Sequence, residues 1–398
     1  MEENSIAIGN DAYVQGKTSG GVETAKDAMA IGTRAMATAD RAIAQGHQAK
    51  AIAISSMAQG DDAYATGENS IAQGKSSRAM NRNAIATGNQ AEALGENSIA
   101  TGNLAKATNH DAIATGNQAE ASGYSSIATG TKANANGENA IATGTKAKAL
   151  AKNAIATGTE ALAEGKDAIA TGTNSNAAGN NAIATGKGAN AAGTNAIATG
   201  TSAQATVENA IATGNAAKAT GLNAVATGAN ANASAYNAVA LGANAQATHE
   251  KSVALGSDSI TADAVATSNA TVGNLNYGGF AGTAPVGTVS VGSKGKERTI
   301  TNVAAGRITA ESTDAINGSQ LHATNTVLGN VASSTRGILG GNAHLGTDGK
   351  LAMTNIGGTN ENTVHDAIKY AAQGWTVKTN SGTATQVKPG DAVDFVNG

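Results

Sequence analysis

Glycine recurs at a fixed interval of 14 residues through more than half of this 398-residue chain. The register runs from Gly32 to Gly256, which is 16 steps of 14 without an insertion or a deletion. Gly9 lies 23 residues before Gly32, so an insertion of nine residues separates one earlier copy. In most copies the residues before the glycine read I-A-T. A strict period of this length predicts identical units stacked on one another, so that each unit contacts only its neighbours.

Each repeat contains two short runs in which small and larger residues alternate. With the glycine as position 0, position −2 is Ala, and positions −4, +3 and +5 are nearly always Ala or Ser. Position −3 is mostly Ile, with Val late in the series and Met29 and Met57 as early exceptions. Alternation with period two predicts strands, and a helix would not tolerate the frequent glycines. A second glycine often stands at +7, and we expect both glycines to supply positive φ at the corners of a parallel β-roll.

The composition fits a very thin core. Aromatic residues make up 2% of the chain, and its 40% hydrophobic content is mostly alanine. We therefore expect Ala and Ser to fill the inside of each coil and the residues at −3 to point outward. The outward column contains Ile85, Ile99, Ile113, Ile127, Ile141, Ile155, Ile169, Ile183, Ile197 and Ile211. A continuous apolar column needs a cover, and identical copies of the chain are the simplest one, although the pattern does not set their number.

Charge and motif content point away from chemistry. With 14% charged residues and a net charge of −3, the chain has no basic stripe for nucleic acid, and without cysteine it has no disulfide or thiolate metal site. Within the repeats His47, His110 and His249 occupy different columns, so we expect no metal site. Residues 74–76 read G-K-S, but Asn69 stands where a phosphate-binding loop needs its first glycine. We predict no catalytic residue, no cofactor and no bound metal, and the calcium-binding nonapeptide is absent.

The register fades after Gly256. Residues 267–292 are rich in glycine and look like an insertion, and Leu321 and Leu328 belong to a weak heptad. Residues 360–374 predict a helix capped by Asn362 and ended by Gly374, with Val364, Ile368 and Ala371 on one face. The alternation that follows, with a turn at residues 388–391, predicts a small β-containing module.

The repeat N-A-I-A-T-G-x-x-A-x-A resembles the head repeat of the trimeric autotransporter adhesins, the YadA-like family. Residues 69–74 (NSIAQG) are similar to the family's own pattern. Residues 298–321 (RTITNVAAGRITAESTDAINGSQL) look like its neck, and this motif is highly specific. Residues 267–290 look like its head insert, and residues 374–396 are similar to its tryptophan-ring module. The resemblance covers nearly the whole chain, in the family's order.

The resemblance implies a division of the chain. It comprises a head at 1–266, an insert at 267–292, a neck at 293–324, a short stalk or connector at 325–359, and a helix with a tryptophan-ring-like module at 360–398. The fold implied is mainly all-β: a left-handed parallel β-roll of 14-residue coils in a homotrimer, followed by the neck, a short coiled coil and a small α+β module. The isoleucine column and Trp375 would then lie in the trimer core. Position −1 departs from the family, because it is Thr from Thr87 to Thr227 instead of Ile, which leaves room for ordered water or ions.

The function implied is that of an exported, surface-exposed passenger segment at the bacterial outer membrane. It would attach bacteria to host extracellular matrix or host cells, with autoaggregation and biofilm formation as further roles. We expect contact with the membrane only through an anchor outside these residues, because the chain reads as part of something longer. No residue stands out as a ligand-binding residue.

Two other classes of protein also use solenoids. An ice-binding protein would use a column of Thr, as at position −1, but flat ice-binding faces pair Thr as T-x-T, and position −3 here is Ile. A hexapeptide-repeat acyltransferase has a similar repeat, but it is built from six-residue units and needs a general base. The neck-like motif favours an adhesin over both.

Overall fold

The computed structural model describes the backbone of residues 4–19 and 22–395. It describes the side chains of residues 4–16 and 25–395. The chain divides into two compact units. The first contains residues 1–267 and 283–299, and the second contains residues 268–282 and 300–398.

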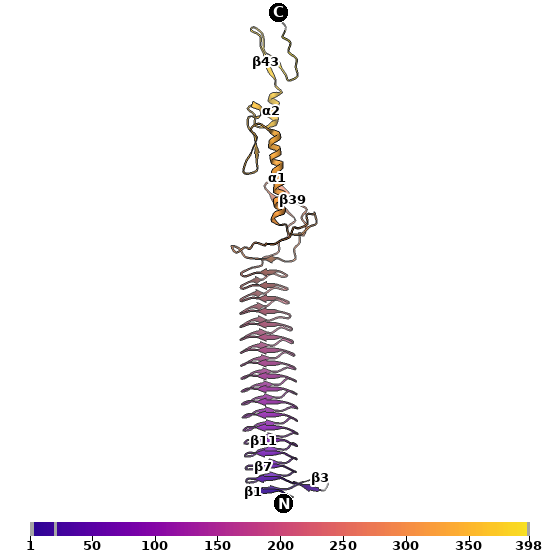
Figure 1. Ribbon diagram of the computed structural model, residues 1–398, viewed down its shortest axis with the longest axis vertical. Helices are drawn as coiled ribbons and strands as arrows, with labels where there is room; N and C mark the ends of the chain where they lie inside the picture. Colours follow the sequence, from indigo (N-terminus) through magenta and orange to yellow (C-terminus); the bar gives the residue numbers. More distant parts are fainter. Residues whose placement is uncertain (1–3, 20–21, 396–398) are drawn as a thin grey trace. The chain divides into compact units, whose positions relative to one another are not determined.

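The first unit is a regular stack of coils (Figure 1). Each coil contributes a three-residue strand to one parallel sheet and a two-residue strand to a second one. The first sheet has 19 strands: β1 (Ile6–Ile8), β5 (Met29–Ile31), one strand per coil from β7 (Ile43–Gln45) to β37 (Val253–Leu255), and β40 (Val289–Ser290). The second sheet contains β2 (Tyr13–Val14), β6 (Met36–Ala37) and one strand per coil from β8 (Lys50–Ala51) to β36 (Gln246–Ala247).

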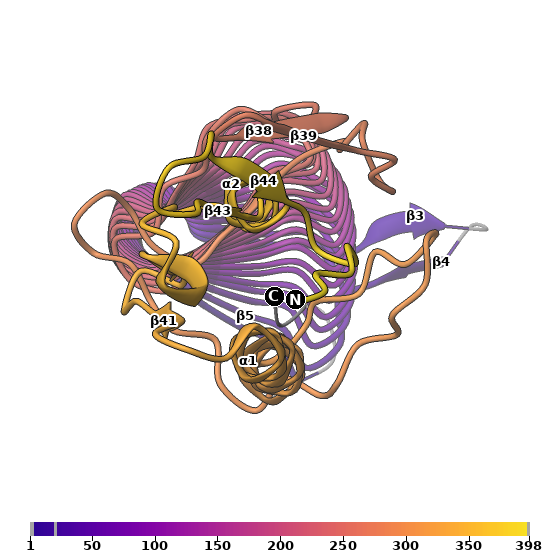
Figure 2. The ribbon, with the colours of Figure 1, turned by 90° about the horizontal axis from the view of Figure 1, so that it is seen from above.

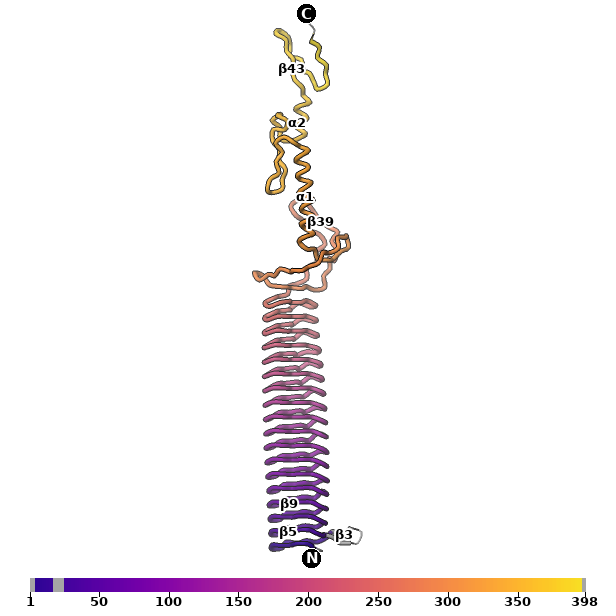
Figure 3. Tube along the Cα trace, in the orientation of Figure 1, coloured from indigo at the N-terminus to yellow at the C-terminus, as the bar shows by residue number. Residues whose placement is uncertain are grey.

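Neighbouring coils pair without any shift in register. Ile113 pairs with Ile127, and Thr115 pairs with Thr129, so each residue faces the residue 14 positions later. The tube in Figure 3 shows the same spacing from coil to coil through the roll. At about 4.8 Å per stacked strand, the 16 steps between Gly32 and Gly256 span about 77 Å. The predicted all-β solenoid of 14-residue coils is thus confirmed.

The insertion of nine residues between the first two coils forms an antiparallel hairpin. Its strands are β3 (Lys17–Ser19) and β4 (Val22–Thr24). Figure 2 shows this hairpin projecting sideways from the roll, so the coils on either side of it still stack, through the pairing of β1 with β5.

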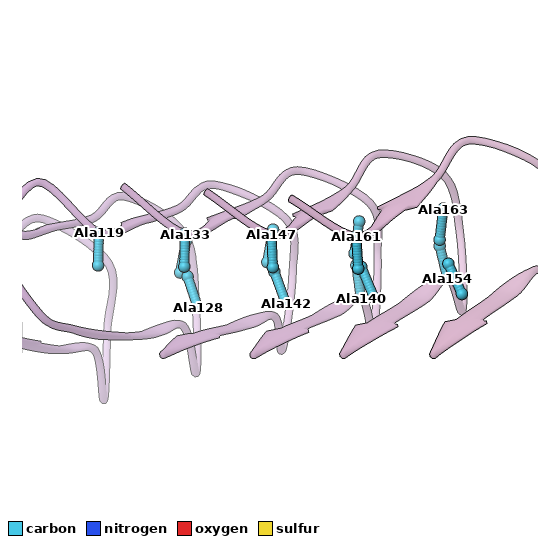
Figure 4. Packing of buried hydrophobic residues seen from close by; sticks show 14 of the residues in the cluster. Ala119, Ala128, Ala133, Ala140, Ala142, Ala147, Ala154, Ala161 and Ala163 are labelled. Carbon is cyan, nitrogen blue, oxygen red and sulfur yellow. The ribbon is translucent and has the colours of Figure 1, made fainter. Parts of the chain in front are cut away.

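The core of the roll is built from alanine and serine. In one coil Ala112, Ala114, Ala119 and Ala121 are all fully buried, which are positions −4, −2, +3 and +5. Figure 4 shows such side chains from the two sheets meeting inside the coil. Where serine replaces alanine its hydroxyl is satisfied locally, as when Ser98 Oγ donates to the Gly95 carbonyl at 2.6 Å. The prediction that small residues point inward is confirmed, and only small side chains fit in so narrow a coil.

The glycine column at position 0 forms the first corner. From Gly32 to Gly242 its members have φ between +126° and +141°, which side-chain-bearing residues rarely adopt. A Cβ on Gly116 would also lie 2.6 Å from the Gly130 carbonyl oxygen of the next coil. Both the backbone conformation and the close stacking therefore require glycine here.

The expectation that glycine at +7 also supplies positive φ is wrong. Gly95 and Gly123 do not adopt it, and the left-handed residue of that corner lies at +9, as in Asn97 with φ 57°. Glycine at +7 serves close approach instead, since a Cβ on Gly95 would lie 1.9 Å from the Asn109 carbonyl oxygen. A side chain that can bond locally tolerates the left-handed conformation, which explains the asparagine at +9.

The asparagines at +9 form ladders of side-chain hydrogen bonds. Asn69 donates to Asn83 at 3.3 Å, Asn83 to Asn97 at 2.9 Å, and Asn97 to Asp111 at 3.0 Å. Every amide donates toward the C-terminal coil, and a carboxylate, which only accepts, ends the series. A second ladder ends in the same way at Asp167.

The C-terminal end of the roll is closed by the segment that returns after the insertion. In β40, Val289 pairs with Val253 and Ser290 pairs with Ala254. The Arg298 guanidinium donates to the carbonyl oxygens of Ser257 at 2.5 Å and Val291 at 2.7 Å. It thereby bonds carbonyl groups at the end of the stack, where solenoids need a cap. Residues 283–299 therefore belong to the roll, and the excursion from it ends earlier than residue 292, because the repeat pattern resumes at β40.

The second unit contains short elements around one longer helix. They are the hairpin of β38 (Asn269–Val272) and β39 (Leu275–Gly278), α1 (Gly318–Leu339), the hairpin of β41 (His344–Leu345) and β42 (Leu351–Ala352), the 3-10 turn η1 (Ile356–Gly358), α2 (Val364–Ala371), and the hairpin of β43 (Trp375–Val377) and β44 (Thr385–Val387). The weak heptad of the sequence thus lies on a regular helix, whose start is fixed by a capping box between Asn317 and Gln320.

The predicted helix at 360–374 is shorter than expected. Thr363, not Asn362, is its N-cap, because the Thr363 hydroxyl accepts from the Asp366 amide at 3.0 Å. Asn362 instead accepts from the Asn355 amide at 3.0 Å. Ala367 is the buried member of the helix, whereas Ile368, expected on the apolar face, is exposed.

Candidate binding surface

The unshifted stacking turns every outward position into a continuous column along the roll. Seen from above, each coil is slightly offset from the one before it, and equivalent residues still follow one another (Figure 2). The first sheet presents positions −3 and −1, the second sheet presents +4, and the two corners present +2 and +8. A functional surface on this roll is therefore a set of columns rather than a pocket.

The isoleucine column lies outside the alanine core, as predicted. Its members from Ile85 to Ile211 are partly exposed, because each isoleucine covers its neighbours in the column. Thr115 and Thr129, at position −1 beside it, are exposed. Trp375 belongs to the second unit, where it is 55% exposed and pairs with Val387 across the hairpin.

The +4 column carries the charge of the second sheet. In the six coils after the N-terminal region it contains Lys50, Tyr64, Arg78, Glu92, Lys106 and Glu120. The amine of Lys106 lies 3.5 Å from the Glu92 carboxylate, and the Lys50 amine lies 5.9 Å from the centre of the Tyr64 ring. A shallow hollow of about 400 Å³ runs beside the column between Lys50 and Lys106. These residues were not singled out by the sequence analysis, and the signal that could have found them is the order of charges in one column.

The corner at +8 combines aromatic and charged groups. The rings of His110 and Tyr124 stack with their centres 5.2 Å apart, and the His110 ring lies 3.9 Å from the Glu96 carboxylate. Further along, the Lys152 amine lies 3.0 Å from the Glu138 carboxylate.

The +2 corner contains one close ion pair, between Lys146 and Glu160 at 2.7 Å. The hydrogen bond between the two side chains raises the pKa of Lys146 and lowers the pKa of Glu160. Both groups are solvent-exposed, so the pair contributes little to the stability of the fold.

Glu96, His110 and Asp111 form a small group of titratable residues on the roll, in which the His110 ring lies 2.6 Å from the Asp111 carboxylate. Among residues 4–19 and 22–395, no three His, Asp or Glu side chains are placed so that they could hold a metal ion. His47 contacts Asp61 at 2.8 Å, and His249 contacts Asp263 at 3.4 Å, in different columns. In the same described ranges no helix is long and apolar enough to cross a membrane.

In the second unit, α1 has no buried residue. Leu321, Leu328 and Val331 are all more than half exposed, and their spacing places them on one side of the helix.

Two sets of polar contacts stabilise the segment before the helix. Arg307 donates to Asp314 at 2.8 Å and 3.0 Å, and the Gln320 side chain donates to the Gly306 carbonyl oxygen at 2.7 Å.

A stack of coils with the same backbone and with columns of side chains, followed by a helix without a buried side chain, defines a fibrous repeat protein. Comparison with protein families specifies the class further. The YadA head domain repeat matches ten segments between residues 24 and 259, and the coiled stalk of trimeric autotransporter adhesins matches residues 299–343. The head repeats cover more than half of the chain, and the chain belongs to the family of trimeric autotransporter adhesins. The family consists of adhesins and not of enzymes, which confirms the expectation that the chain is not an enzyme.

Two curated relatives match parts of the chain. The autotransporter adhesin BtaE of Brucella suis biovar 1 (strain 1330) is 63% identical over 75 residues, which is 19% of this chain and 10% of that protein. The trimeric autotransporter adhesin AtaA of Acinetobacter sp. (strain Tol 5) is 41% identical over 101 residues, 25% of this chain and 2% of that protein. The matched parts thus span a tenth or less of these relatives.

Two solved structures show local similarity. The C-terminal YadA-like domain of a Burkholderia pseudomallei protein is 46% identical, with a TM-score of 0.23, over 31% of this chain and 55% of that one. The collagen-binding domain of the Yersinia adhesin YadA is 20% identical, with a TM-score of 0.19, over 66% of this chain and 86% of that one.

Proposed function

We propose that three copies of this chain assemble into a surface adhesin, with the isoleucine column facing the trimer axis. The observation that carries the proposal is this column, which runs unbroken from Ile85 to Ile211 outside the core of a single chain. Apolar surface of that length is unfavourable in water, and burial against two identical columns removes it from solvent. The threonines at −1 make the neighbouring part of the interface more polar.

The exposed helix α1 supports the same assembly. A helix of 22 residues without a buried side chain gains little from packing in one chain. Leu321 and Leu328, seven residues apart, would form the seam of a coiled coil. Trp375, exposed in the single chain, would pack in the same way against its copies.

The trimer would present its outward columns at a bacterial surface, to which the protein is exported. We infer that it attaches bacteria to host extracellular matrix or to host cells. Each outward column is repeated in three chains, so weak contacts add up through avidity without a deep pocket. Membership in the adhesin family and the shallow, column-like surface support this function.

The assembly can be tested by replacing three isoleucines in adjacent coils, with Ile113, Ile127 and Ile141 all changed to Asp. Carboxylates in the proposed interface should dissociate the head, since burying an unpaired charge is costly. Light scattering on the purified chain measures the mass. As a matched control, Thr115, Thr129 and Thr143 are changed to Ser, which keeps the hydroxyl column. An unchanged mass and melting temperature for the isoleucine variant would show that the column does not form the interface.

Adhesion can be tested with the assembled chain on a surface coated with collagen, fibronectin or laminin, and with host cells. We expect binding to at least one of them that weakens strongly when the trimer is dissociated. Absence of binding to all four, by a chain of verified trimeric mass, would contradict the proposed host-adhesion role.

A further inference from the structure

The +4 column carries charges of both signs in an order that is complementary to the same column when reversed. The column contains, from the N-terminal side, Lys50, Tyr64, Arg78, Glu92, Lys106 and Glu120. Its midpoint lies between the coils of Arg78 and Glu92. At equal distances from the midpoint, Arg78 corresponds to Glu92, Tyr64 to Lys106 and Lys50 to Glu120. The column is therefore complementary to a copy of itself that runs in the opposite direction.

Two antiparallel copies placed face to face about a twofold axis at this midpoint bring opposite charges together. Arg78 of each copy faces Glu92 of the other, and Lys50 faces Glu120. Arg78 and Glu120 are exposed, and Lys50 and Glu92 are partly exposed, so all four can reach a second molecule. Because the axis is twofold, each pair occurs twice.

The remaining pair of the column joins Tyr64 to Lys106. An amine over a tyrosine ring is attractive, and the structure already contains this type of contact in the same column, between Lys50 and Tyr64 at 5.9 Å. Lys106, which lies 3.5 Å from Glu92 in its own chain, is 49% exposed and can contact both groups. The column thus has no like-charge pair over six coils.

The +8 corner has the same centre of symmetry, although its residues are different. Arg82 lies opposite Glu96 in the antiparallel arrangement. Ile54 and Tyr124 also lie opposite each other, and they are two of the large apolar side chains left exposed on the roll, at 45% and 49%. Two independent columns therefore indicate one common register.

Other arrangements of two copies are disfavoured by charge. In a parallel, unshifted arrangement Arg78 would face Arg78 and Glu92 would face Glu92. A shift of the antiparallel pair by one coil in one direction would place Glu92 against Glu92 and Arg78 against Lys106. A shift in the other direction would place Arg78 against Arg78 and Lys50 against Lys106. Like charges in contact cost free energy, so these arrangements are disfavoured relative to the unshifted antiparallel one.

The matching charges are confined to a zone that extends from the coil of Lys50 to the coil of Glu120. Beyond it, Asp40 would face Glu138 and Arg34 would face Lys132, so the match does not extend over the whole roll. Between the coils of Lys50 and Glu120 there are five steps, or about 24 Å of contact at about 4.8 Å per coil.

From these two columns we infer that the outward second sheet is a docking surface for a second copy of this chain, in antiparallel orientation. Two adhesins that project from facing cells meet in opposite directions, so the surface joins molecules on different cells and not neighbours on one cell. The inference rests on the proposed trimer in one respect: the second sheet of each chain must remain exposed on the outside of the trimer. It is independent of any host ligand.

Charge reversal tests the register directly. Red and green beads carry the purified full chain, attached at its C-terminus, and clusters are counted by flow cytometry. Arg78→Glu beads should not cluster with themselves, because residue 78 then repels Glu92, and Glu92→Arg beads should also fail. Each should form at least about tenfold fewer clusters than the unaltered chain, as expected for the loss of one repeated ion pair or more.

Mixing the two variants should restore clustering between red and green beads, because both opposed pairs are then of opposite sign. The double variant R78E/E92R should cluster with itself but not with the unaltered chain. Clustering should also weaken when the ionic strength rises from about 0.05 M to about 0.5 M. As a control, Glu208→Arg, the same charge change at an exposed +8 residue outside the zone, should leave clustering unchanged.

The mass of every variant is measured by light scattering, which separates loss of the trimer from loss of docking. Three outcomes would overturn the inference for variants of unaltered mass: self-clustering of Arg78→Glu beads at the original level, no recovery in the mixture, or no clustering of the unaltered chain. A trimer that binds no host ligand but still shows the charge-swap pattern would contradict the proposed host adhesion and support the docking surface.

Discussion

Replacing one glycine of the column at position 0 by alanine tests how tightly the coils are stacked. In Gly116→Ala the new methyl group would lie 2.6 Å from the Gly130 carbonyl oxygen and 2.7 Å from its carbon. Gly116 also has φ +133°, a conformation that costs a non-glycine residue about 1–3 kcal/mol. The clash adds to this cost, so we expect a local destabilisation of at least about 2 kcal/mol.

Hydrogen exchange reports such a change where it occurs. The amides of Gly116 and Gly130 donate to the carbonyls of Thr101 and Thr115, both at 2.8 Å. A loss of about 2 kcal/mol corresponds to about 30-fold faster exchange at these amides, if exchange occurs through local opening. Coils several repeats away should keep their protection, because stability in a solenoid is transmitted through nearest neighbours.

The matched control is Gly188→Ala, the same change at position +2 of another coil. A Cβ there would lie 3.8 Å from the nearest atom, Ser202 Oγ, and Ala216 already occupies that column with φ 52°. We expect a clearly smaller effect there, because the new methyl group meets no backbone atom. Equal exchange at Gly130 in Gly116→Ala and in the unaltered chain would refute the reasoning about the column.

Three other perturbations test features outside the alanine core. Asn83→Asp removes the side-chain amide that donates to Asn97 at 2.9 Å, and it should lower the free energy of unfolding by about 1 kcal/mol, measured by chemical denaturation. Asn83→Gln keeps an amide donor, so it should lower the free energy of unfolding less. Arg298→Ala removes the guanidinium that bonds the end of the stack, so hydrogen exchange should become faster at the Gly256 amide but not at the Gly116 amide. The same exchange rate at Gly256 in the variant and in the unaltered chain would argue against a cap. The Arg307 guanidinium lowers the pKa of Asp314, so this contact stabilises the segment before α1 above the carboxyl's ordinary pKa and is lost as the pH falls through the lowered value. Thermal melting of this segment should therefore become pH-dependent only in that acid range, and Asp314→Asn should remove the dependence.

The sequence analysis predicted the roll well because its constraints repeat in every coil. The 14-residue period, the small residues at four positions and the isoleucine column allow one arrangement of strands. The role of glycine at +7 was wrong for a physical reason: a glycine required for positive φ and one required for close approach look alike in a sequence. The left-handed residue at +9 is Asn in most coils but Asp, Ser, Lys or Arg in others, so its signal is weaker than that of an invariant glycine.

Outside the roll, prediction depended on short sequence signals, such as capping residues, that are compatible with more than one structure. Asn362 and Thr363 are both good caps, and only the backbone around Asn355 shows which of them is used. The polar residues of the docking surface were overlooked because each is an ordinary surface residue by itself. Their meaning lies in the order of charges along one column, which becomes visible once the register between coils is known.

The absence of any register shift between coils also makes the length of the roll adjustable in fixed increments. Removal of any 14 consecutive residues from the regular part would rejoin coils whose hydrogen bonds and alanine contacts are the same as before, and shorten the rod by about 4.8 Å. Length can thus vary among related chains without a new folding problem. The asparagine ladders and the charge order of the second sheet do not share this freedom, because they depend on which coil is next to which. A chain shortened between residues 50 and 120 would keep its architecture and lose its match to an unshortened copy, so such a change would separate populations of cells that no longer recognise one another.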